Sequence, residues 1–274
     1  MSKTWLITGT SSGFGRLITQ KLLARGDRVI ATARKPEALA DLAQDGLIVE
    51  TLDITDGAAI RDVVDRSFAR GRVDVVVSNA GYAVFGAAEE ASEAQIEHQL
   101  DTNLLGSLLL IRAAIPRLRA QGGGRILQVS SEGGQIAYPN FSLYHASKWG
   151  IEGFVEATAL DVAPFGIALT LVEPGPAATD FGKGLVRPAR IAEYEKTPAG
   201  EVQRAIDSGS FELTGDPDKM VGAMIACADS ATPPKRLVLG STAYHSIEKA
   251  LIERLDSLRA QKEVAFEADK QHRA

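Results

Sequence analysis

Seven short apolar runs recur along this chain, and longer amphipathic segments separate them. The runs cover residues 4–8, 28–33, 47–52, 73–79, 124–130, 167–173 and 236–240. Most are continuously apolar and rich in Val, Ile, Leu and Thr, which is typical of strands covered on both faces. The segments between them have helical patterns over about 15–26, 56–70, 92–121, 142–165, 215–229 and 242–269. This alternation predicts an α/β fold, a doubly wound Rossmann-type parallel sheet of about seven strands with helices on both faces.

The chain of 274 residues has no internal repeat and no Pro/Gly/Ser-rich linker. We therefore expect a single Rossmann-type domain over residues 1–274. Two regions depart from the alternation. Residues 178–210 follow the sixth apolar run without a strand pattern, and we expect them to form a substrate lid. The last helical pattern runs over about 242–269, and its charged part after Gln261 is expected to fray.

Charge and apolar patterning argue against several kinds of partner. The formal net charge of −5 gives no overall basic field, so nucleic acid is not expected. The longest apolar stretch, residues 104–115, is too short and interrupted to span a bilayer. The N-terminal stretch lacks the apolar core of a signal peptide. Cys227 is the single cysteine, so an internal disulfide is impossible. We expect a structural thiol and a cytoplasmic location.

The remaining polar candidates predict no metal site. The four histidines are widely spaced and show no metal-ligand pattern with Cys or carboxylates. His145 is expected to have a surface or packing role. Residues 247–263 combine charges of both signs with a Leu/Ile stripe, which suits an amphipathic helix on the protein or at a subunit contact. A homo-oligomer, dimer or tetramer, is expected.

A glycine-rich turn joins the first apolar run to the first helical segment. Its sequence, TGTSSGFG, covers residues 8–15. Glycines let the backbone turn sharply and approach a ligand, and the helix that follows presents free N–H groups to a pyrophosphate. Hydroxyls of the turn can add hydrogen bonds to phosphate. At the first strand–helix junction this turn predicts a dinucleotide site, formed by Gly9, Ser11, Ser12, Gly13, Phe14 and Gly15, with a further hydroxyl from Thr10.

The end of the second apolar run indicates which dinucleotide is bound. An acid here usually holds the adenosine ribose of NAD, whereas a basic residue accommodates the 2′-phosphate of NADP. Ala33 occupies the acid's position, and Arg34 and Lys35 follow it. We expect Arg34 to grip the phosphate, so that NADP(H) is preferred and NAD(H) remains possible. After the third run, Asp53 and the adjoining Ile54 are expected at the adenine, although an Asp or Thr nearby also suits a helix N-cap.

Three more apolar runs end in small or polar residues. Ligands bind at the carboxyl ends of strands in open α/β sheets. We therefore expect further cofactor contacts from Asn79, Ala80 and Gly81 after the fourth run, and from Pro174, Gly175 and Thr179 after the sixth. Ser130 and Ser131 end the fifth run.

Tyr144 and Lys148 lie four positions apart on a predicted helix, and so on one face of it. A nearby ammonium favours the phenolate and lowers the pKa of a tyrosine, which otherwise lies near 10. Such a tyrosine can give a proton to a carbonyl oxygen while hydride attacks the carbon. Ser131 can hydrogen-bond the same oxygen, and Lys148 can also hold the nicotinamide ribose. We expect Ser131 and Tyr144 to contact the substrate, a small-molecule carbonyl compound or alcohol.

These motifs together resemble the short-chain dehydrogenase/reductase family over roughly residues 3–240. The family's motifs match TGTSSGFG, NAG at 79–81, YHASK at 144–148 and PGPAAT at 174–179. The resemblance implies NAD(P) chemistry on alcohols and ketones and a catalytic tetrad of Asn103, Ser131, Tyr144 and Lys148. It implies that Asn103 holds a water in a proton relay and that Thr179 contacts the nicotinamide carboxamide. VEPG and the long final helix look most like the branch resembling 17β-hydroxysteroid dehydrogenases.

Two alternatives and one departure accompany this interpretation. The chain could instead be a non-catalytic NADP(H)-sensing regulator, or an epimerase or dehydratase acting on sugar nucleotides. The intact Ser-Tyr-Lys set argues against the first, and the glycine spacing against the second. Some NADP-using members carry a basic residue inside the glycine turn, which this chain lacks. The substrate surface is expected to be apolar or aromatic, with contributions from Tyr138, Phe141, Leu185, Val186, Ile191 and Tyr194.

Overall fold

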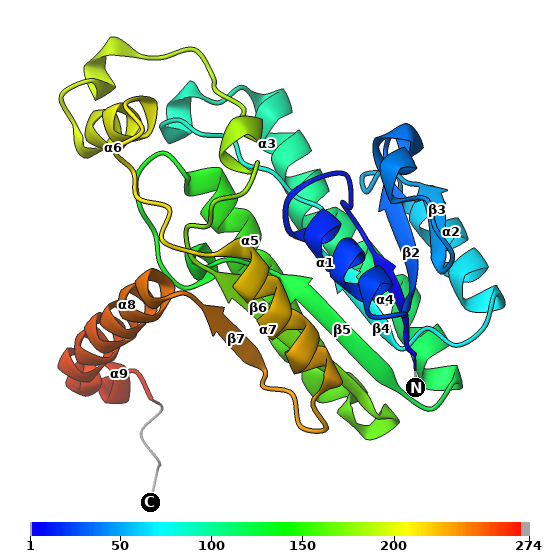
Figure 1. Ribbon diagram of the computed structural model, residues 1–274. Helices are drawn as coiled ribbons and strands as arrows, with labels where there is room; N and C mark the ends of the chain where they lie inside the picture. The colour runs from blue at the N-terminus through cyan, green and yellow to red at the C-terminus, as the bar shows by residue number, and fades with distance from the viewer. Residues whose placement is uncertain (1, 270–274) are drawn as a thin grey trace, which may run out of the picture.

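The computed structural model describes residues 2–269 and is built around one seven-stranded sheet (Figure 1). Every strand pairs with its neighbours in parallel, in the order β3-β2-β1-β4-β5-β6-β7. The predicted fold class is confirmed, and each predicted strand is present within two residues of its expected ends. The strands are β1 (Thr4–Ile7), β2 (Arg28–Ala33), β3 (Leu47–Thr51), β4 (Val75–Ser78), β5 (Gly124–Val129), β6 (Ile167–Pro174) and β7 (Arg236–Leu239).

Helices cover both faces of the sheet, and each face has its own apolar core. On one face α1 (Gly13–Ala24) packs beside α7 (Pro217–Asp229). On the other face α2 (Gly57–Ala69), α4 (Gly106–Ala120) and α5 (Ser142–Val162) lie side by side. This two-sided burial explains why the strands read as continuously apolar. Short 3-10 turns lie at Pro36–Leu42, Ala88–Glu90, Glu132–Gly134, Ala163–Phe165, Gly182–Gly184 and Ala192–Tyr194.

The predicted helix over 92–121 is interrupted. It consists of α3 (Glu93–Leu100), a π-helical turn at Asp101–Leu105, and α4. The pattern of apolar residues continues through the turn, so periodicity alone did not reveal the break. Gly106 follows the turn, where a Cβ would lie 2.5 Å from the Ile54 carbonyl oxygen. The π-turn matters for function because such insertions often occur at functional sites.

Residues 178–210 form a compact excursion over the carboxyl ends of the strands. As expected, they contain no strand, but they contain a helix that the sequence analysis did not predict, α6 (Pro198–Asp207). An isolated parallel β-bridge joins Val186 to Val84. The backbone of Ile191 also donates to Glu90 Oε1 at 2.8 Å. The excursion is therefore tied to the loop after β4.

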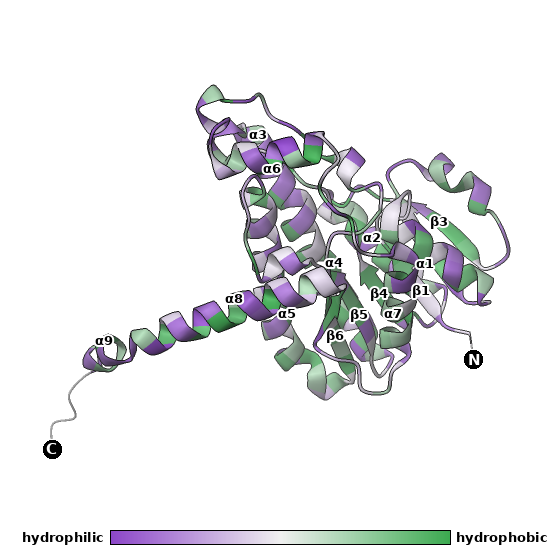
Figure 2. Cartoon of the chain, turned by 60° about the vertical axis from the view of Figure 1, so that its left-hand side comes forward, coloured by the Kyte–Doolittle hydropathy of each residue, from purple (hydrophilic) through white to green (hydrophobic). Residues whose placement is uncertain are grey.

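The C-terminal helices extend away from the body of the molecule (Figure 2). The predicted helix over 242–269 divides at Gln261 into α8 (Ser241–Ala260) and α9 (Lys262–Glu267). Only the start of α8 is buried, at Ala243 and Ile247. From Leu251 to Asp269 every side chain is exposed. Fraying of the charged end stays a prediction, and part of it falls on residues after 269, outside the described residues.

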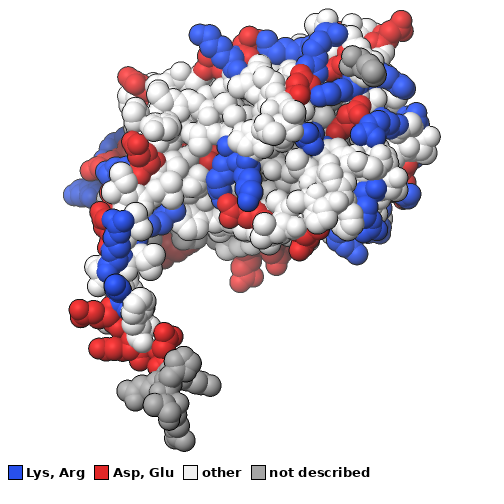
Figure 3. All heavy atoms as spheres, turned by 90° about the horizontal axis from the view of Figure 1, so that it is seen from below, with Lys and Arg blue, Asp and Glu red and all other residues white. Residues whose placement is uncertain are grey.

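The surface carries mixed charge. On the face shown in Figure 3, Lys and Arg side chains alternate with Asp and Glu rather than gathering in one basic area. No helix within residues 2–269 combines the length and apolar character needed to cross a membrane.

Candidate active site

The glycine turn after β1 has no room for a side chain at Gly9 or Gly15. Gly9 has a φ of +69°, a conformation that favours glycine. A Cβ at Gly15 would overlap the Gly9 carbonyl oxygen and lie 2.6 Å from Asn79 Nδ2. The Asn79 amide donates to the carbonyl oxygens of Thr8 at 2.9 Å and Gly9 at 3.1 Å. Asn79 therefore fixes the turn from the neighbouring strand end, and the N-terminus of α1 opens onto the same edge.

The hydroxyls of this turn differ in their availability. Thr10 is fully buried, and its Oγ1 donates to the Thr32 carbonyl at 2.9 Å. The expectation that Thr10 contributes to phosphate binding is wrong, because that hydroxyl holds β2 instead. Ser11 and Ser12 are exposed, and Ser12 is the N-cap of α1 but makes no side-chain capping bond. Phe14 packs against the core on the α1 face. Two free hydroxyls thus flank the helix N-terminus.

A basic and an acidic side chain share the edge beyond β2 and β3. Ala33 ends β2 with 4% of its surface exposed, and Arg34 next to it is exposed. Asp53 accepts from Thr55 N at 3.0 Å and Thr55 Oγ1 at 2.8 Å. The Thr55 N–H, and to a lesser extent the charge of Arg34, lower the pKa of Asp53.

The sequence analysis left open which Asp or Thr near Asp53 caps the next helix; the N-cap of α2 is Asp56. Asp56 accepts from the N–H groups of Ala58 and Ala59 at the start of α2. Asp53 is therefore not needed as a cap. Ile54 is buried in the core beneath α4, so only its backbone could face a ligand.

The π-turn before α4 brings Asn103 to the carboxyl end of β4. Asn103 is 1% exposed, and its Oδ1 accepts from Tyr82 N at 3.0 Å. Its Nδ2 donates to the Tyr82 carbonyl at 2.8 Å and to Ser147 Oγ at 3.3 Å. A Cβ at Gly81 would lie 3.2 Å from Asn103 Oδ1, so the NAG segment and Asn103 pack directly together. Ala80 packs against the core on the same side.

The end of β6 is fastened by β7 and α8. Gly175 N donates to the Leu239 carbonyl at 2.9 Å, and a Cβ at Gly175 would lie 3.1 Å from Ala243 Cβ. Pro174 is buried at the strand end, and Thr179 follows, partly exposed. These residues line the same edge of the sheet as the glycine turn, because all the strands are parallel.

Tyr144 and Lys148 lie one turn apart on α5, and both are buried. Lys148 Nζ lies 5.4 Å from the centroid of the Tyr144 ring and donates to the Val129 carbonyl at 2.9 Å. The Ser131 hydroxyl lies near enough to the Tyr144 phenol to act against the rise of its pKa, and it accepts from Gly133 N at 3.0 Å. The structure therefore brings together the three residues that the sequence analysis placed at the reacting carbonyl.

The electrostatics of Tyr144 differ from the expectation. Burial raises the pKa of Tyr144 to about 12, although the Ser131 hydroxyl acts in the opposite direction. The predicted lowering by Lys148 is not what the structure shows. Burial lowers the pKa of Lys148 itself to about 8, against the opposing charge of Glu152. Desolvation is the largest cause of both shifts, since both side chains lie away from water.

The sequence analysis missed a charged network that lies behind Ser130 and Ser131, at the end of β5. Glu152 lies one turn after Lys148 on α5 and is 3% exposed. Its Oε1 accepts from Ser130 Oγ at 2.6 Å, and its Oε2 accepts from Arg236 at 2.6 Å. Arg236 also pairs with the fully buried Glu173. The only sequence signal was the i, i+4 spacing of Glu152 from Lys148. The network anchors the end of β5 to α5 and β7.

His145 is buried and links two parts of the segment between β5 and α5. Its Nδ1 lies 2.8 Å from the Gly133 carbonyl, and its Nε2 accepts from Tyr138 N at 3.1 Å. Nδ1 therefore carries the proton, and burial lowers the pKa of the ring. Of the two roles left open for His145, the structure shows packing rather than surface exposure.

An apolar wall surrounds the Tyr144 ring. Its residues come from the segment just before α5, from the loop after β4 and from the excursion over 178–210. The Phe181 ring centroid lies 5.7 Å from that of Tyr144. Of the predicted lining residues, Ile191 and Tyr194 lie outside this cluster, and Val186 pairs with Val84 at its margin. The wall comprises Ala83, Phe85, Tyr138, Phe141, Leu185, Val202 and Ile206.

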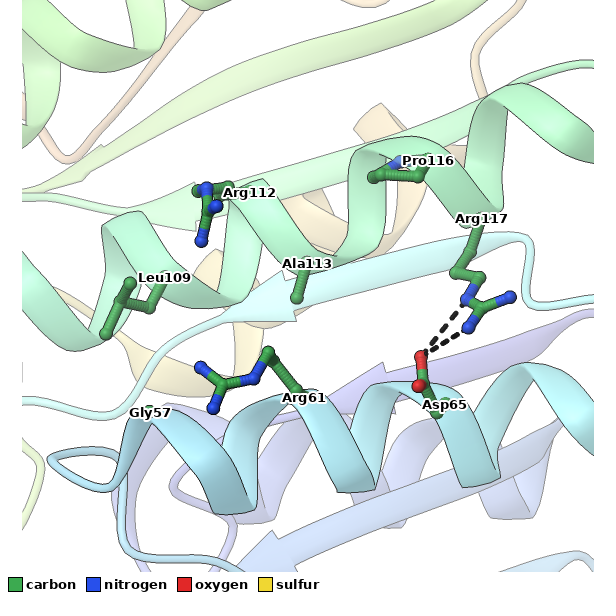
Figure 4. A pocket seen from close by; sticks show the side chains of 8 residues that line it. All are labelled: Gly57, Arg61, Asp65, Leu109, Arg112, Ala113, Pro116 and Arg117. Carbon is green, nitrogen blue, oxygen red and sulfur yellow. Dashed lines mark hydrogen bonds and ion pairs between the residues drawn. The ribbon is translucent and has the colours of Figure 1, made fainter.

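A separate groove lies between α2 and α4, away from these residues (Figure 4). Arg61 and Arg112 point into it, while Arg117 is paired with Asp65 at 2.8 Å. None of the residues that we assign to catalysis lines this groove, so we place no chemistry in it. Within residues 2–269 no cluster of His, Cys, Asp or Glu is arranged to hold a metal ion.

Comparison with known proteins confirms the family resemblance. A model of the short chain dehydrogenase family matches residues 3–189. Oxidoreductase BOA17 of Botryotinia fuckeliana is 36% identical over 255 residues, 91% of this chain and 93% of that protein. The 3-ketodihydrosphingosine reductase of Bacteroides thetaiotaomicron is 38% identical over 189 residues, 69% of this chain and 67% of that protein. A short-chain dehydrogenase structure from Streptomyces avermitilis has a TM-score of 0.90 at 38% identity and covers 98% of both chains. This chain therefore belongs to the short-chain dehydrogenase family.

Proposed function

We propose that the protein is an NADP(H)-dependent oxidoreductase that interconverts a ketone or aldehyde and an alcohol. The observation that carries this proposal is the convergence of Ser131, Tyr144 and Lys148 at the carboxyl edge of the sheet. The same edge presents the glycine turn and the open N-terminus of α1. A dinucleotide and a carbonyl group can thus be held side by side.

The nicotinamide cofactor supplies or accepts the hydride when bound. In the reduction direction, Ser131 hydrogen-bonds the carbonyl oxygen and fixes its position. Tyr144 donates its phenolic proton to that oxygen. The high pKa of Tyr144 keeps the phenol protonated at neutral pH and ready to donate. The ammonium of Lys148 then stabilises the phenolate that remains, and we assign it the cofactor ribose as a second partner. Asn103 holds the loop after β4 and is assigned to the proton relay.

The preference for NADP(H) rests on the edge beyond β2. Within residues 2–269 the Arg34 guanidinium has no hydrogen-bonded or ion-pair partner, so it is free to meet a 2′-phosphate. Ser11 and Ser12 can bind the pyrophosphate, and Asp53 can accept from the adenine amino group. NAD(H) use remains compatible with the same edge.

The substrate class follows from the apolar wall. The rings of Phe141 and Phe181 lie beside Tyr144, and Phe85 packs against Phe141. These aromatic rings favour an apolar or aromatic carbonyl compound. The relative from Bacteroides is named for the reduction of a ketone. The finer resemblance to 17β-hydroxysteroid dehydrogenases stays a prediction, as does a cytoplasmic location.

Replacing Tyr144 by Phe tests the proposal. We expect turnover of a panel of aryl and alkyl ketones to be nearly abolished, because only the hydroxyl carries the proton. NADPH binding, followed by cofactor fluorescence, should persist. The alternative of a sensor that binds NADP(H) without turnover would be favoured if the wild type binds NADPH but oxidises it with none of the ketones. A sugar-nucleotide enzyme has no specific observation in its favour.

A homo-oligomer is proposed from the C-terminal arm, defined as residues 251–269. The arm exposes an apolar stripe that no part of the described chain covers, although helices in proteins gain most of their stability from packing of such a face. A second copy of the chain is the occupant we propose. Light scattering of the wild type and of a Leu255→Glu/Leu258→Glu variant tests this. A monomeric wild type would contradict it. The stripe comprises Leu251, Ile252, Leu255, Leu258, Val264 and Phe266.

A further inference from the structure

Glu132 follows the catalytic serine and is a buried acid without a partner. It is 3% exposed, and its Oε2 has no hydrogen-bond partner within residues 2–269. The other deeply buried acids are paired. Glu152 and Glu173 meet Arg236, and Asp27 meets Trp5 and Arg25. Unpaired buried carboxyl groups are costly to a fold, so Glu132 is an exception that needs an explanation.

The two glycines that follow Glu132 lie against α5. A Cβ at Gly133 would lie 2.8 Å from His145 Nδ1, and one at Gly134 would overlap the Glu152 carboxyl group. The charge of Glu132 instead acts on the phenols of Tyr138 and Tyr144. Glu132 is therefore close to the proton donor and to the aromatic wall beside it.

The environment of the carboxyl group supplies no compensating charge. Burial alone raises the pKa of Glu132 to about 7, and no cation opposes this effect. A side chain that destabilises a fold is commonly retained for function, because functional sites often sacrifice stability. The buried acids around Glu132 already have partners within the described residues. The Glu132 carboxyl group does not, so a ligand can supply its missing hydrogen bond.

We propose that Glu132 is a specificity-determining residue whose carboxyl group binds a hydroxyl or amino group that the substrate carries close to its reacting carbonyl. This inference rests on the proposed function and narrows its substrate class. The preferred substrate is then an apolar ketone with a hydrogen-bond donor near the carbonyl, rather than a plain hydrocarbon ketone. A site built to bind such a donor discriminates strongly against the analogue that lacks it, because its own polar group is then left unpaired.

The same carboxyl group could in principle meet a donor of the cofactor, namely the nicotinamide carboxamide. We assign it to the substrate because the two groups that feel its charge, Tyr138 and Tyr144, lie where the carbonyl compound must sit. The two sources are separated by measuring NADPH affinity and ketone kinetics on the same variants. A loss of NADPH affinity in Glu132→Leu would move the contact to the cofactor and overturn the assignment to substrate.

The first test needs no substrate. Thermal unfolding of Glu132→Gln and Glu132→Leu is compared with the wild type and with Asp161→Asn, which removes an exposed acid near the C-terminal end of α5. We expect the Tm of both Glu132 variants to rise by about 2 °C or more, because an unpaired buried carboxyl group is removed. A lower Tm in both would show that the carboxyl group has a structural partner, which would overturn the inference.

The second test uses matched ketones, 2-hydroxyacetophenone and acetophenone. For the wild type we expect a higher kcat/KM with the hydroxylated ketone. Glu132→Leu should lose about 10- to 100-fold of that value, mainly through KM, as for loss of one hydrogen bond to a charged group. Glu132→Leu should change the turnover of acetophenone little, and Asp161→Asn should change the kinetics with either ketone little. Equal losses for both ketones would contradict a role in specificity.

The outcome also separates this inference from the proposed function. If the wild type reduces neither ketone, the proposed function fails for this class, and binding decides the role of Glu132. The Tm of the protein with NADP is then measured with each ketone. Greater stabilisation by 2-hydroxyacetophenone that disappears in Glu132→Leu supports the inference. Equal stabilisation by the two ketones, or none, overturns it.

Discussion

Replacing Arg34 by Leu should weaken NADPH binding while leaving NADH binding almost unchanged. The guanidinium is exposed and has no partner within the described residues, so its charge is available to the 2′-phosphate. Loss of one charge-assisted and bidentate contact costs about 1.5–3 kcal/mol, or roughly 10- to 100-fold in affinity. Two features favour the lower part of this range: the site is open to solvent, and the Asp53 carboxylate lies within the field of Arg34.

Fluorescence titration of both cofactors provides the measurement, repeated at two salt concentrations. The loss should shrink at high salt, because exposed charges are screened. Arg61→Leu is the matched control, since it removes an arginine from the groove between α2 and α4, none of whose lining residues we assign to the cofactor. Adding Ala33→Asp should turn the preference toward NADH. Ala33 is almost buried, so the Tm of that variant must be checked. Equal affinity of the wild type for NADH and NADPH would refute the reasoning.

Three further predictions concern the lysine, the excursion over 178–210 and pH. Lys148→Ala should lose both turnover and part of its NADPH affinity, and unchanged affinity in the titration would remove the ribose contact. Hydrogen exchange over 178–210 should slow when NADP and a substrate analogue bind, as expected of a lid; equal strong protection in both states would argue against one. The folded protein binds more protons at Glu132 than the unfolded chain between about pH 4.5 and 7, so this group lowers stability as pH rises. Glu132→Gln should therefore stabilise the protein more at pH 8 than at pH 5 in denaturant titrations, and an equal gain at both would contradict the shift.

The order of strands and helices could be predicted because it depends on local patterns. A parallel sheet buried on both faces requires continuously apolar strands, and β1, β4 and β6 show them. The carboxyl edge follows from the same topology, because every parallel strand ends on one side. The sequence was therefore enough to predict that Ser131 would meet Tyr144.

Features that depend on contacts between distant segments needed the tertiary structure. The π-turn around Asn103 interrupts a helical pattern that continues unbroken in the sequence. The hydroxyl of Thr10 could not be recognised as part of the sheet until β2 was seen beside it. The helix α6 was likewise missed; of its ten residues only Gly200 is buried.

The charges at the site were decided by burial, which a sequence does not display. Spacing alone predicted that Lys148 would lower the pKa of Tyr144, but desolvation by burial raises the pKa of Tyr144 and lowers that of Lys148. The partners of Glu152 and Glu173 come from β7, more than sixty residues further along the chain. The lack of a partner at Glu132 is recognised only by comparison with those paired acids.

The sequence by itself determined the sheet and the residues at its edge, because local periodicity and topology dictate them. The tertiary structure decided which of those residues are paired, buried or free, because charge energetics depend on neighbours brought together by folding.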